Sequence, residues 1–218
     1  MADNAGPGGF ADPLDGKFKD WFELYNPNPD AVDLSGFYLT DDLALRTQWR
    51  IPTNSPISGH GFLLVWADNK TNLNGLSPNG DLHAAFKLNK DGEAIGLFAP
   101  DGVAAQSAVT FGPQMHNVSQ GRFPDGSAEG VYFMADFTPL SPNALPPLQF
   151  TRISVTNGLV VLEWQAIPAQ SYRLQYQTNL TDEWIDLAPD VVAGGKLVQS
   201  TNALGPAGPR FFRVRRIN

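Results

Sequence analysis

The sequence of 218 residues contains no cysteine and only three histidines. The absence of cysteine excludes disulfides, zinc–thiolate sites and cysteine nucleophiles, and three scattered histidines argue against a multi-histidine metal site. The longest strongly apolar run is Gly61–Ala67, far short of the ~20 residues that span a bilayer. Residues 1–6 show neither the basic region nor the apolar core of a signal peptide. We therefore expect no cofactor, no metal ion and no membrane insertion.

Basic residues are also in short supply. The chain holds 15 Lys and Arg against 22 Asp and Glu, a net charge of −7, which argues against general nucleic-acid binding. The charge is unevenly divided, because residues 1–145 hold 8 basic and 17 acidic side chains, whereas residues 146–218 hold 7 and 5. A shift of this size supports a chain of two parts.

No stretch shows a sustained helical period, and the sequence is instead rich in turn residues, with 21 Gly and 18 Pro. A high content of glycine and proline is typical of short strands joined by turns. The pair Asp101-Gly102 between two apolar segments predicts a type I′ hairpin. The strands that we expect in the first part are Asp20–Asn26, Val32–Thr40, Gln48–Ile51, Gly61–Ala67, Leu82–Leu88, Glu93–Ala99 and Val103–Thr110.

A domain boundary is expected in Thr138–Pro147, where four of ten residues are proline. This divides the chain into residues 1–144 and 145–218. The second part contains six short apolar segments at the spacing of a small β-sandwich: Phe150–Val155, Gly158–Trp164, Ser171–Gln177, Trp184–Leu187, Lys196–Thr201 and Arg210–Arg216. In Ser171–Gln177, apolar and polar side chains alternate, which predicts one buried face and one wet face.

The first part, over about residues 1–144, resembles the lamin tail domain in its bacterial form. The motifs that carry the resemblance are, in order, Asp20-Trp-Phe-Glu-Leu-Tyr-Asn26, Val32-Asp-Leu-Ser-Gly-Phe-Tyr-Leu-Thr-Asp41, Trp49-Arg-Ile-Pro52, Gly61-Phe-Leu-Leu-Val-Trp-Ala-Asp68, Phe86-Lys-Leu88, Gly92-Glu93, Asp101-Gly102, Gly121-Arg-Phe-Pro-Asp-Gly126 and Thr138-Pro139. The resemblance implies an immunoglobulin-like β-sandwich without catalytic residues, in a module of a larger and often exported protein.

The beginning of the sequence departs from that family. Its members usually open with a strand like Ile-Asn-Glu-x-Met-Ala-x-Asn, and this sequence begins in the middle of the motif, at Met1-Ala-Asp-Asn4. We therefore expect an uncovered sheet edge where the first strand would pair, which invites association with another chain. Coverage of that edge by residues 1–10 would make this expectation wrong.

The second part resembles, more loosely, a fibronectin type III-like module. The segments that carry this likeness are Leu162-Glu-Trp164, Ser171-Tyr-Arg-Leu-Gln-Tyr176, Trp184 and Phe211-Phe-Arg-Val214. The expected fold class is thus all-β, with an immunoglobulin-like sandwich followed by a second, smaller sandwich.

Catalytic motifs are incomplete. Asn117-Val-Ser-Gln-Gly121 lacks the first glycine of a nucleophile elbow and any following helical pattern. Gly195-Lys196 lacks the first glycine and the Ser or Thr of a phosphate-binding loop. His60, His83 and His116 have no histidine at ligand spacing. We predict no enzyme activity and assign no catalytic or metal-binding residue.

Two kinds of ligand stay open as alternatives. Loop acids could contribute oxygens to calcium: Asp12, Asp15, Asp41, Asp42 and Asp68. Exposed aromatic rings could stack on sugars, with Trp49 the most plausible exposed ring among Trp21, Trp49, Trp66, Trp164 and Trp184. Core packing of the tryptophans and turn capping by Asp41 and Asp42 are the favoured interpretations. The arginines of Arg210–Arg216 suit an edge strand protected by charge, or an anionic partner.

The sequence thus predicts a non-enzymatic structural or protein-interaction module of a larger bacterial surface or secreted protein. Its partner would be another protein, or a second copy that uses the open sheet edge. The alternative is an accessory carbohydrate- or calcium-binding module of a secreted enzyme, with a polysaccharide as a possible ligand. The resemblance, rather than any leader sequence, implies an extracellular or cell-surface location.

Overall fold

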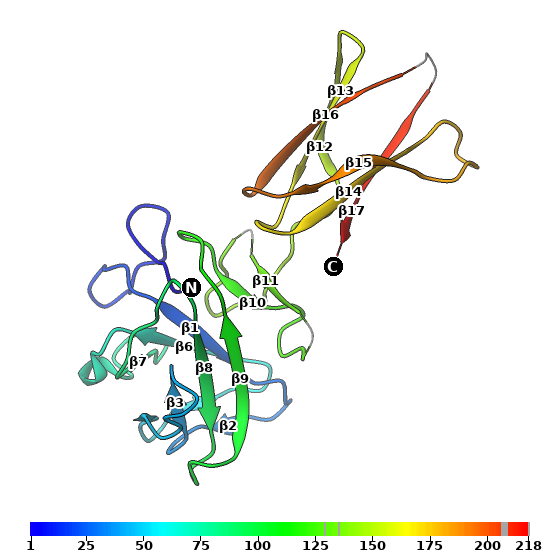
Figure 1. Ribbon diagram of the computed structural model, residues 1–218. Helices are drawn as coiled ribbons and strands as arrows, with labels where there is room; N and C mark the ends of the chain where they lie inside the picture. The colour runs from blue at the N-terminus through cyan, green and yellow to red at the C-terminus, as the bar shows by residue number, and fades with distance from the viewer. Residues whose placement is uncertain (129, 135, 206–208, 218) are drawn as a thin grey trace. The chain divides into compact units, whose positions relative to one another are not determined.

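The computed structural model describes residues 1–128, 130–134, 136–205 and 209–217 (Figure 1). Among these residues the only helical element is a short 3-10 turn, η1 (Thr71–Leu73), and the rest of the regular structure is β. Contacts divide the chain into two compact units, Met1–Val131 with Asp136–Asn143, and Tyr132–Ala135 with Ala144–Asn218. The fold is all-β with two β-sandwich modules, as expected. The exact domain boundary at residues 144 and 145 stays a prediction.

Two sheets form the first unit. One has the strand order β1-β6-β7, and the other has the order β4-β3-β8-β9. The short pair β2-β5 also belongs to this unit, and β10-β11 is a further short pair in the chain before the second set of sheets. The bounds are β1 (Trp21–Tyr25), β2 (Val32–Asp33), β3 (Tyr38–Thr40), β4 (Trp49–Arg50), β5 (Pro56–Ile57), β6 (Phe62–Ala67), β7 (Leu82–Ala84), β8 (Glu93–Phe98), β9 (Ala105–Phe111), β10 (Gln120–Arg122) and β11 (Val131–Phe133).

Strand β6 is the centre of its sheet, antiparallel to β1 and parallel to β7. Alternate residues of a strand point to opposite faces, and both faces of β6 are buried. Leu63, Val65 and Ala67 join one core cluster with Phe22 of β1. Leu64 and Trp66 join a second cluster with Met1 and Trp21. The prediction of a central strand that is apolar on both faces is confirmed.

Two local expectations are wrong. Val32–Thr40 is not one strand but β2 and β3, because Gly36 has a φ of +83° and Phe37 N–H donates to Leu34 C=O in a turn between them. The β8–β9 hairpin forms as expected, but not through a type I′ turn. That turn needs positive φ at both central residues, and of Asp101 and Gly102 only Gly102 has it.

The second unit contains two three-stranded sheets, ordered β12-β13-β16 and β15-β14-β17. All six strands expected from the sequence are present: β12 (Phe150–Thr156), β13 (Leu159–Gln165), β14 (Ser171–Gln177), β15 (Ile185–Val192), β16 (Leu197–Ala203) and β17 (Phe211–Ile217). Side chains of both sheets share one core, in which Trp164 of β13 packs edge-on against Tyr172 of β14.

The expected wet face of β14 is only partly wet. Tyr172 and Leu174 are buried as predicted, but Gln175 and Gln177 on the opposite face are also buried. For Gln175 the cause is its neighbours across the sheet, since its amide donates to Asp186 and its oxygen accepts a hydrogen bond from Arg213 Nε at 2.7 Å. A layer of polar side chains therefore covers this face, which alternation alone cannot predict.

Candidate functional site

The hydrogen-bonding pattern of β1 leaves part of its outer edge open. Ala67 N–H donates to Asp20 C=O, and Asn26 N–H donates to Gly61 C=O. In an antiparallel ladder such bonded pairs alternate with unbonded ones. The backbone groups of Phe22 and Leu24 therefore face β6, whereas those of Trp21, Glu23 and Tyr25 face away from it.

The first of the three outward positions of β1 is covered by the chain itself. Met1 N donates to Trp21 C=O at 2.7 Å, and Trp21 N–H donates to Met1 C=O at 3.1 Å. Asn4 anchors the same segment, because its backbone N–H donates to the Asp20 carboxylate. The expectation of a fully uncovered edge is thus wrong at Trp21.

Beyond Trp21 the edge has no such cover. Among the described residues, no backbone partner is found for Glu23 or Tyr25 on the outer side of β1. The exchange of two bonds between Met1 and Trp21 is an antiparallel pair. A strand that continued this pairing would meet Glu23 and Tyr25 at the next two hydrogen-bonding positions.

A groove of about 540 Å³ runs beside this open edge. One wall is β1, from Trp21 to Tyr25, and the other includes residues of β9 and β10. Strand β9 is itself the edge of the sheet β4-β3-β8-β9. The groove therefore lies between two sheet edges, and its lining includes the apolar side chains of Leu24, Phe37, Leu97, Val109 and Phe111.

Glu23 is the charged group on the β1 wall of the groove. Burial raises its pKa to about 7, although Leu140 N–H donates a hydrogen bond to its carboxylate. The carboxylate of Asp125, which also lines the groove, adds to the rise. An added positive charge or hydrogen-bond donor beside Glu23 would relieve this unfavourable burial.

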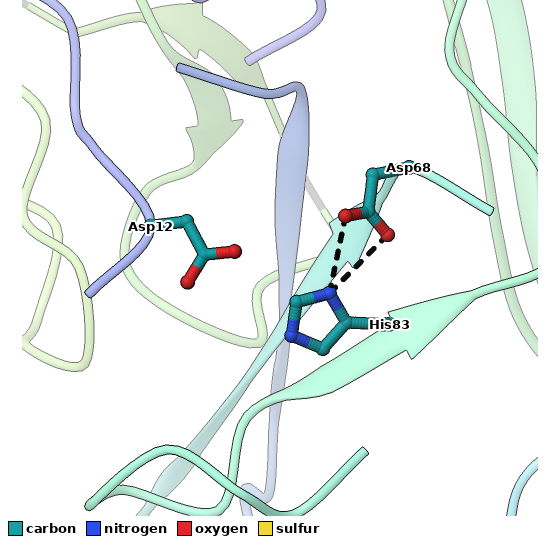
Figure 2. A group of neighbouring side chains, drawn as sticks. All are labelled: Asp12, Asp68 and His83. Carbon is teal, nitrogen blue, oxygen red and sulfur yellow. Dashed lines mark hydrogen bonds and ion pairs between the residues drawn. The ribbon is translucent and has the colours of Figure 1, made fainter. Parts of the chain in front are cut away.

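A second candidate is a cluster of Asp12, Asp68 and His83 (Figure 2), whose ligand atoms all lie within 4.8 Å of one another. Asp12 belongs to an N-terminal turn closed by the Ala11–Phe18 bridge, Asp68 follows β6, and His83 lies on β7. The parallel pairing of Trp66 with His83 brings the last two segments together. His83 Nδ1 lies 3.2 Å from Asp68 Oδ1.

A lysine ammonium group already lies among the carboxylates of this cluster. Lys19 Nζ lies 2.6 Å from Asp12 Oδ2, 3.0 Å from Asp15 Oδ2 and 2.9 Å from Asp68 Oδ2. Burial alone would lower the pKa of Lys19, but its hydrogen bonds to these carboxylates outweigh burial and raise it. The ammonium group thus stands where a bound cation would stand, and the cluster joins the N-terminal turn to the end of β6.

Two buried polar atoms beside the cluster have no hydrogen-bond partner among the described residues, His83 Nε2 and Asp81 Oδ1. Burial raises the pKa of Asp81, although Trp66 Nε1 donates to its other oxygen at 3.3 Å. Three of the acids considered for calcium, Asp12, Asp15 and Asp68, therefore converge as a charge network. Asp12, Asp15 and Lys19 lie within one short segment, whereas Asp68 is about fifty residues further along the chain, so no spacing in the sequence links Asp68 to Lys19.

The other predicted site residues take structural roles. Asp42 caps a turn by accepting a hydrogen bond from Ala44 N–H. Asn117, with a φ of +55°, accepts a hydrogen bond from Ala5 N–H and donates one to Ala5 C=O. The side chain of Asn117 therefore holds the N-terminal segment in place.

The expectation for the tryptophans is partly wrong. Trp21, Trp66 and Trp164 are buried as favoured, but Trp49 is also buried, because β4 pairs with β3 and its ring joins the first core cluster. Trp184 is instead half-buried, with the Arg213 guanidinium 4.2 Å from its ring centre. No pair of exposed tryptophan rings converges among the described residues.

The first unit has the sheets of an immunoglobulin-like β-sandwich, with an open edge and no assembled catalytic group among the described residues. The family model of the lamin tail domain matches residues 2–112, and the chain belongs to this family. The family is immunoglobulin-like, generally non-enzymatic and of a protein-interaction type. No curated protein and no solved structure matches the chain.

The family match ends at residue 112, so the likeness over residues 113–144 stays a prediction. The described part of the chain contains no helix with the length and apolarity needed to cross a membrane.

We predict that Lys19→Met destabilises the protein by about 3–5 kcal/mol, because it leaves buried carboxylates without a counter-charge. Lys70→Met is the matched control, since the exposed Lys70 reaches only Asp15 in the same network, and surface pairs contribute at most about 1 kcal/mol. Urea unfolding monitored by tryptophan fluorescence measures both. Equal losses in the two variants would contradict the network.

The raised pKa of Glu23 predicts that the stability of the protein depends on pH. Its pKa is about 7 in the folded protein against 4.5 in the unfolded chain, so the folded state holds its proton to higher pH. Stability should fall by roughly 2–3 kcal/mol as pH rises from about 4.5 to 7. Glu23→Gln should remove this loss, as measured by the difference between the two unfolding free energies at each pH. A constant difference across that window would contradict the assignment.

Proposed function

We propose that this protein is a non-enzymatic interaction module that binds an extended segment of a partner polypeptide along the open part of β1. The observation that carries the proposal is the pair of outward positions at Glu23 and Tyr25, which face a groove with an apolar lining. An exposed strand edge supplies unpaired donors and acceptors, so that a peptide can add as a further strand.

The groove also limits the chemistry of the occupant. A strand that continues the Met1 pairing runs antiparallel to β1, with alternate side chains on opposite faces. Side chains opposite Phe22 and Leu24 would face the first core cluster, to which both residues contribute. A side chain opposite Glu23 would lie beside that carboxyl group. An apolar segment with basic residues at alternate positions therefore fits best.

The wider setting is part of the proposal. The family membership of residues 2–112 supports a module of a larger protein, and the notion of a bacterial, extracellular or cell-surface protein rests on resemblance alone. The three-plus-three strand arrangement of the second unit supports a fibronectin type III-like module. The same open edge could serve self-association, which the experiment below separates from partner binding.

The accessory-module alternative has less support. A calcium site among the predicted acids is opposed by Lys19, which already contacts three of them. A sugar platform is opposed by burial of Trp49 and by the guanidinium on Trp184. A polysaccharide ligand therefore lacks a convergent aromatic surface among the described residues.

The groove can be tested with a nine-residue peptide of alternating valine and lysine with blocked ends. We expect it to bind the protein, and Val109→Lys to weaken binding by about tenfold or more, because the new charge lies in the groove. Thr110→Lys is the control, since it adds the same charge at the next, exposed position of β9. Fluorescence anisotropy of the labelled peptide measures both.

Three outcomes would contradict the proposal. One is that no peptide binds, and a second is that both lysine variants behave alike. The third is that the protein alone forms a dimer that Val109→Lys dissociates, because the groove would then belong to a second copy.

A further inference from the structure

The second unit has an incompletely covered side between two edge strands. Strand β15 ends at Val192 and β16 begins at Leu197, so only four residues join an edge of one sheet to an edge of the other. So short a link places β15 and β16 on the same side of the sandwich. The other two edges, β12 and β17, therefore lie together on the opposite side.

The inner face of β12 carries two apolar side chains that are more than half exposed. Ile153 pairs with Leu162 and Val155 with Val160, and both partners on β13 are buried in the core. Paired residues share one face of a sheet, so Ile153 and Val155 also point inward. They are nevertheless 53% and 60% exposed. The facing sheet thus stops one strand short of covering them.

The facing edge is β17, which pairs with β14 and, among the strands that the structure describes, has no partner on its other side. Half of the backbone groups of such a strand point to its free edge. A strand added there would extend the sheet β15-β14-β17 over Ile153 and Val155. Its inward side chains would then be buried, which favours apolar residues at alternate positions.

The arginines of β17 indicate which side chains suit the remaining positions of the added strand. Arg213 and Arg215 pair with Gln175 and Arg173 on the outer face, and Arg216 points to the inner face opposite Tyr172. Among the described residues no carboxylate lies within ion-pair distance of these three arginines, and Arg216 Nε is buried without a partner. A strand next to them gains most from acidic side chains.

We infer that the edge of β17, with Ile153 and Val155, docks an extended partner segment of alternating apolar and acidic residues. This site is separate from the groove at β1, which favours a basic segment. Charge complementarity selects the occupant, because the arginines of β17 repel a basic strand and attract an acidic one.

The test uses the full chain and a nine-residue peptide of alternating valine and glutamate with blocked ends. We expect binding, and about tenfold or greater weakening by each of two variants. Ile153→Glu replaces the apolar contact of the peptide's valines with a carboxylate, and Arg215→Glu places a carboxylate beside those of the peptide. Ile153 is exposed, so its replacement should leave the fold intact, as circular dichroism would verify.

The matched controls make the same charge changes on the outer face of the sheet β12-β13-β16, away from the proposed site. Arg152→Glu matches Arg215→Glu, and Thr156→Glu matches Ile153→Glu. Arg152→Glu and Thr156→Glu lie on β12 and pair with Glu163 and Leu159, so neither should alter binding. The valine–lysine peptide and the Val109→Lys variant test the groove at β1 separately. If that groove binds no peptide while the valine–glutamate peptide still binds, the proposed function is wrong and this inference stands.

The inference is overturned if the acidic peptide does not bind, if the basic peptide binds equally well at this edge, or if Ile153→Glu has no effect. It is also overturned if the protein alone dimerises through β17, seen as amide protection of that strand that rises with protein concentration. A second copy would then be the occupant.

Discussion

The burial of β6 on both faces is the constraint on which the first unit depends. A strand with apolar side chains on both sides needs cover from two directions, because each face exposed to water would cost free energy in proportion to its apolar area. One face is covered within the first core cluster, and the other by Trp21, Met1 and neighbouring aromatic rings. The N-terminal turn that carries Asp12 is fixed to the end of β6 by Lys19. The buried charges thus serve the same strand as the buried apolar residues.

That arrangement also explains why the open edge lies where it does. Strand β6 is paired on both sides, so the edge of its sheet on this side is β1, where Met1 pairs with Trp21. The second unit repeats the situation at β17 with the opposite charge. Among the described residues, each unit therefore combines an unpaired strand edge with apolar side chains beside it, and the charges around the two edges differ in sign.

Much of the fold could be predicted from the sequence, because local patterns specify it. Alternation and turn residues identified all six strands of the second unit, and the apolar run Gly61–Ala67 identified the central strand. The failures have non-local causes. The sequence favours Trp49 as an exposed ring, but pairing with β3 buries it. Gln175 is buried by side chains from two neighbouring strands, and a single strand's pattern does not contain them.

The candidate sites were less predictable for the same reason. The sequence offers Asp12, Asp15, Asp41, Asp42 and Asp68 as possible calcium ligands without assigning a site, and only the fold brings Asp68 beside Lys19 and the first two acids. The likeness to the lamin tail domain predicts an open edge. Only the hydrogen bonds between Met1 and Trp21 show which position of that edge is already paired. The groove could not be predicted at all, since its walls come from strands more than 80 residues apart.

Amide hydrogen exchange at β1 is the most direct measurement of the central claim, because exchange reports the hydrogen bonding of each backbone N–H. The amides of Phe22 and Leu24 face β6, and that of Trp21 donates to Met1, so all three should exchange slowly. Those of Glu23 and Tyr25 should exchange fast in the protein alone and slow down when the valine–lysine peptide is added. Slow exchange at Glu23 and Tyr25 without peptide would show that the edge is already paired, and would contradict the account.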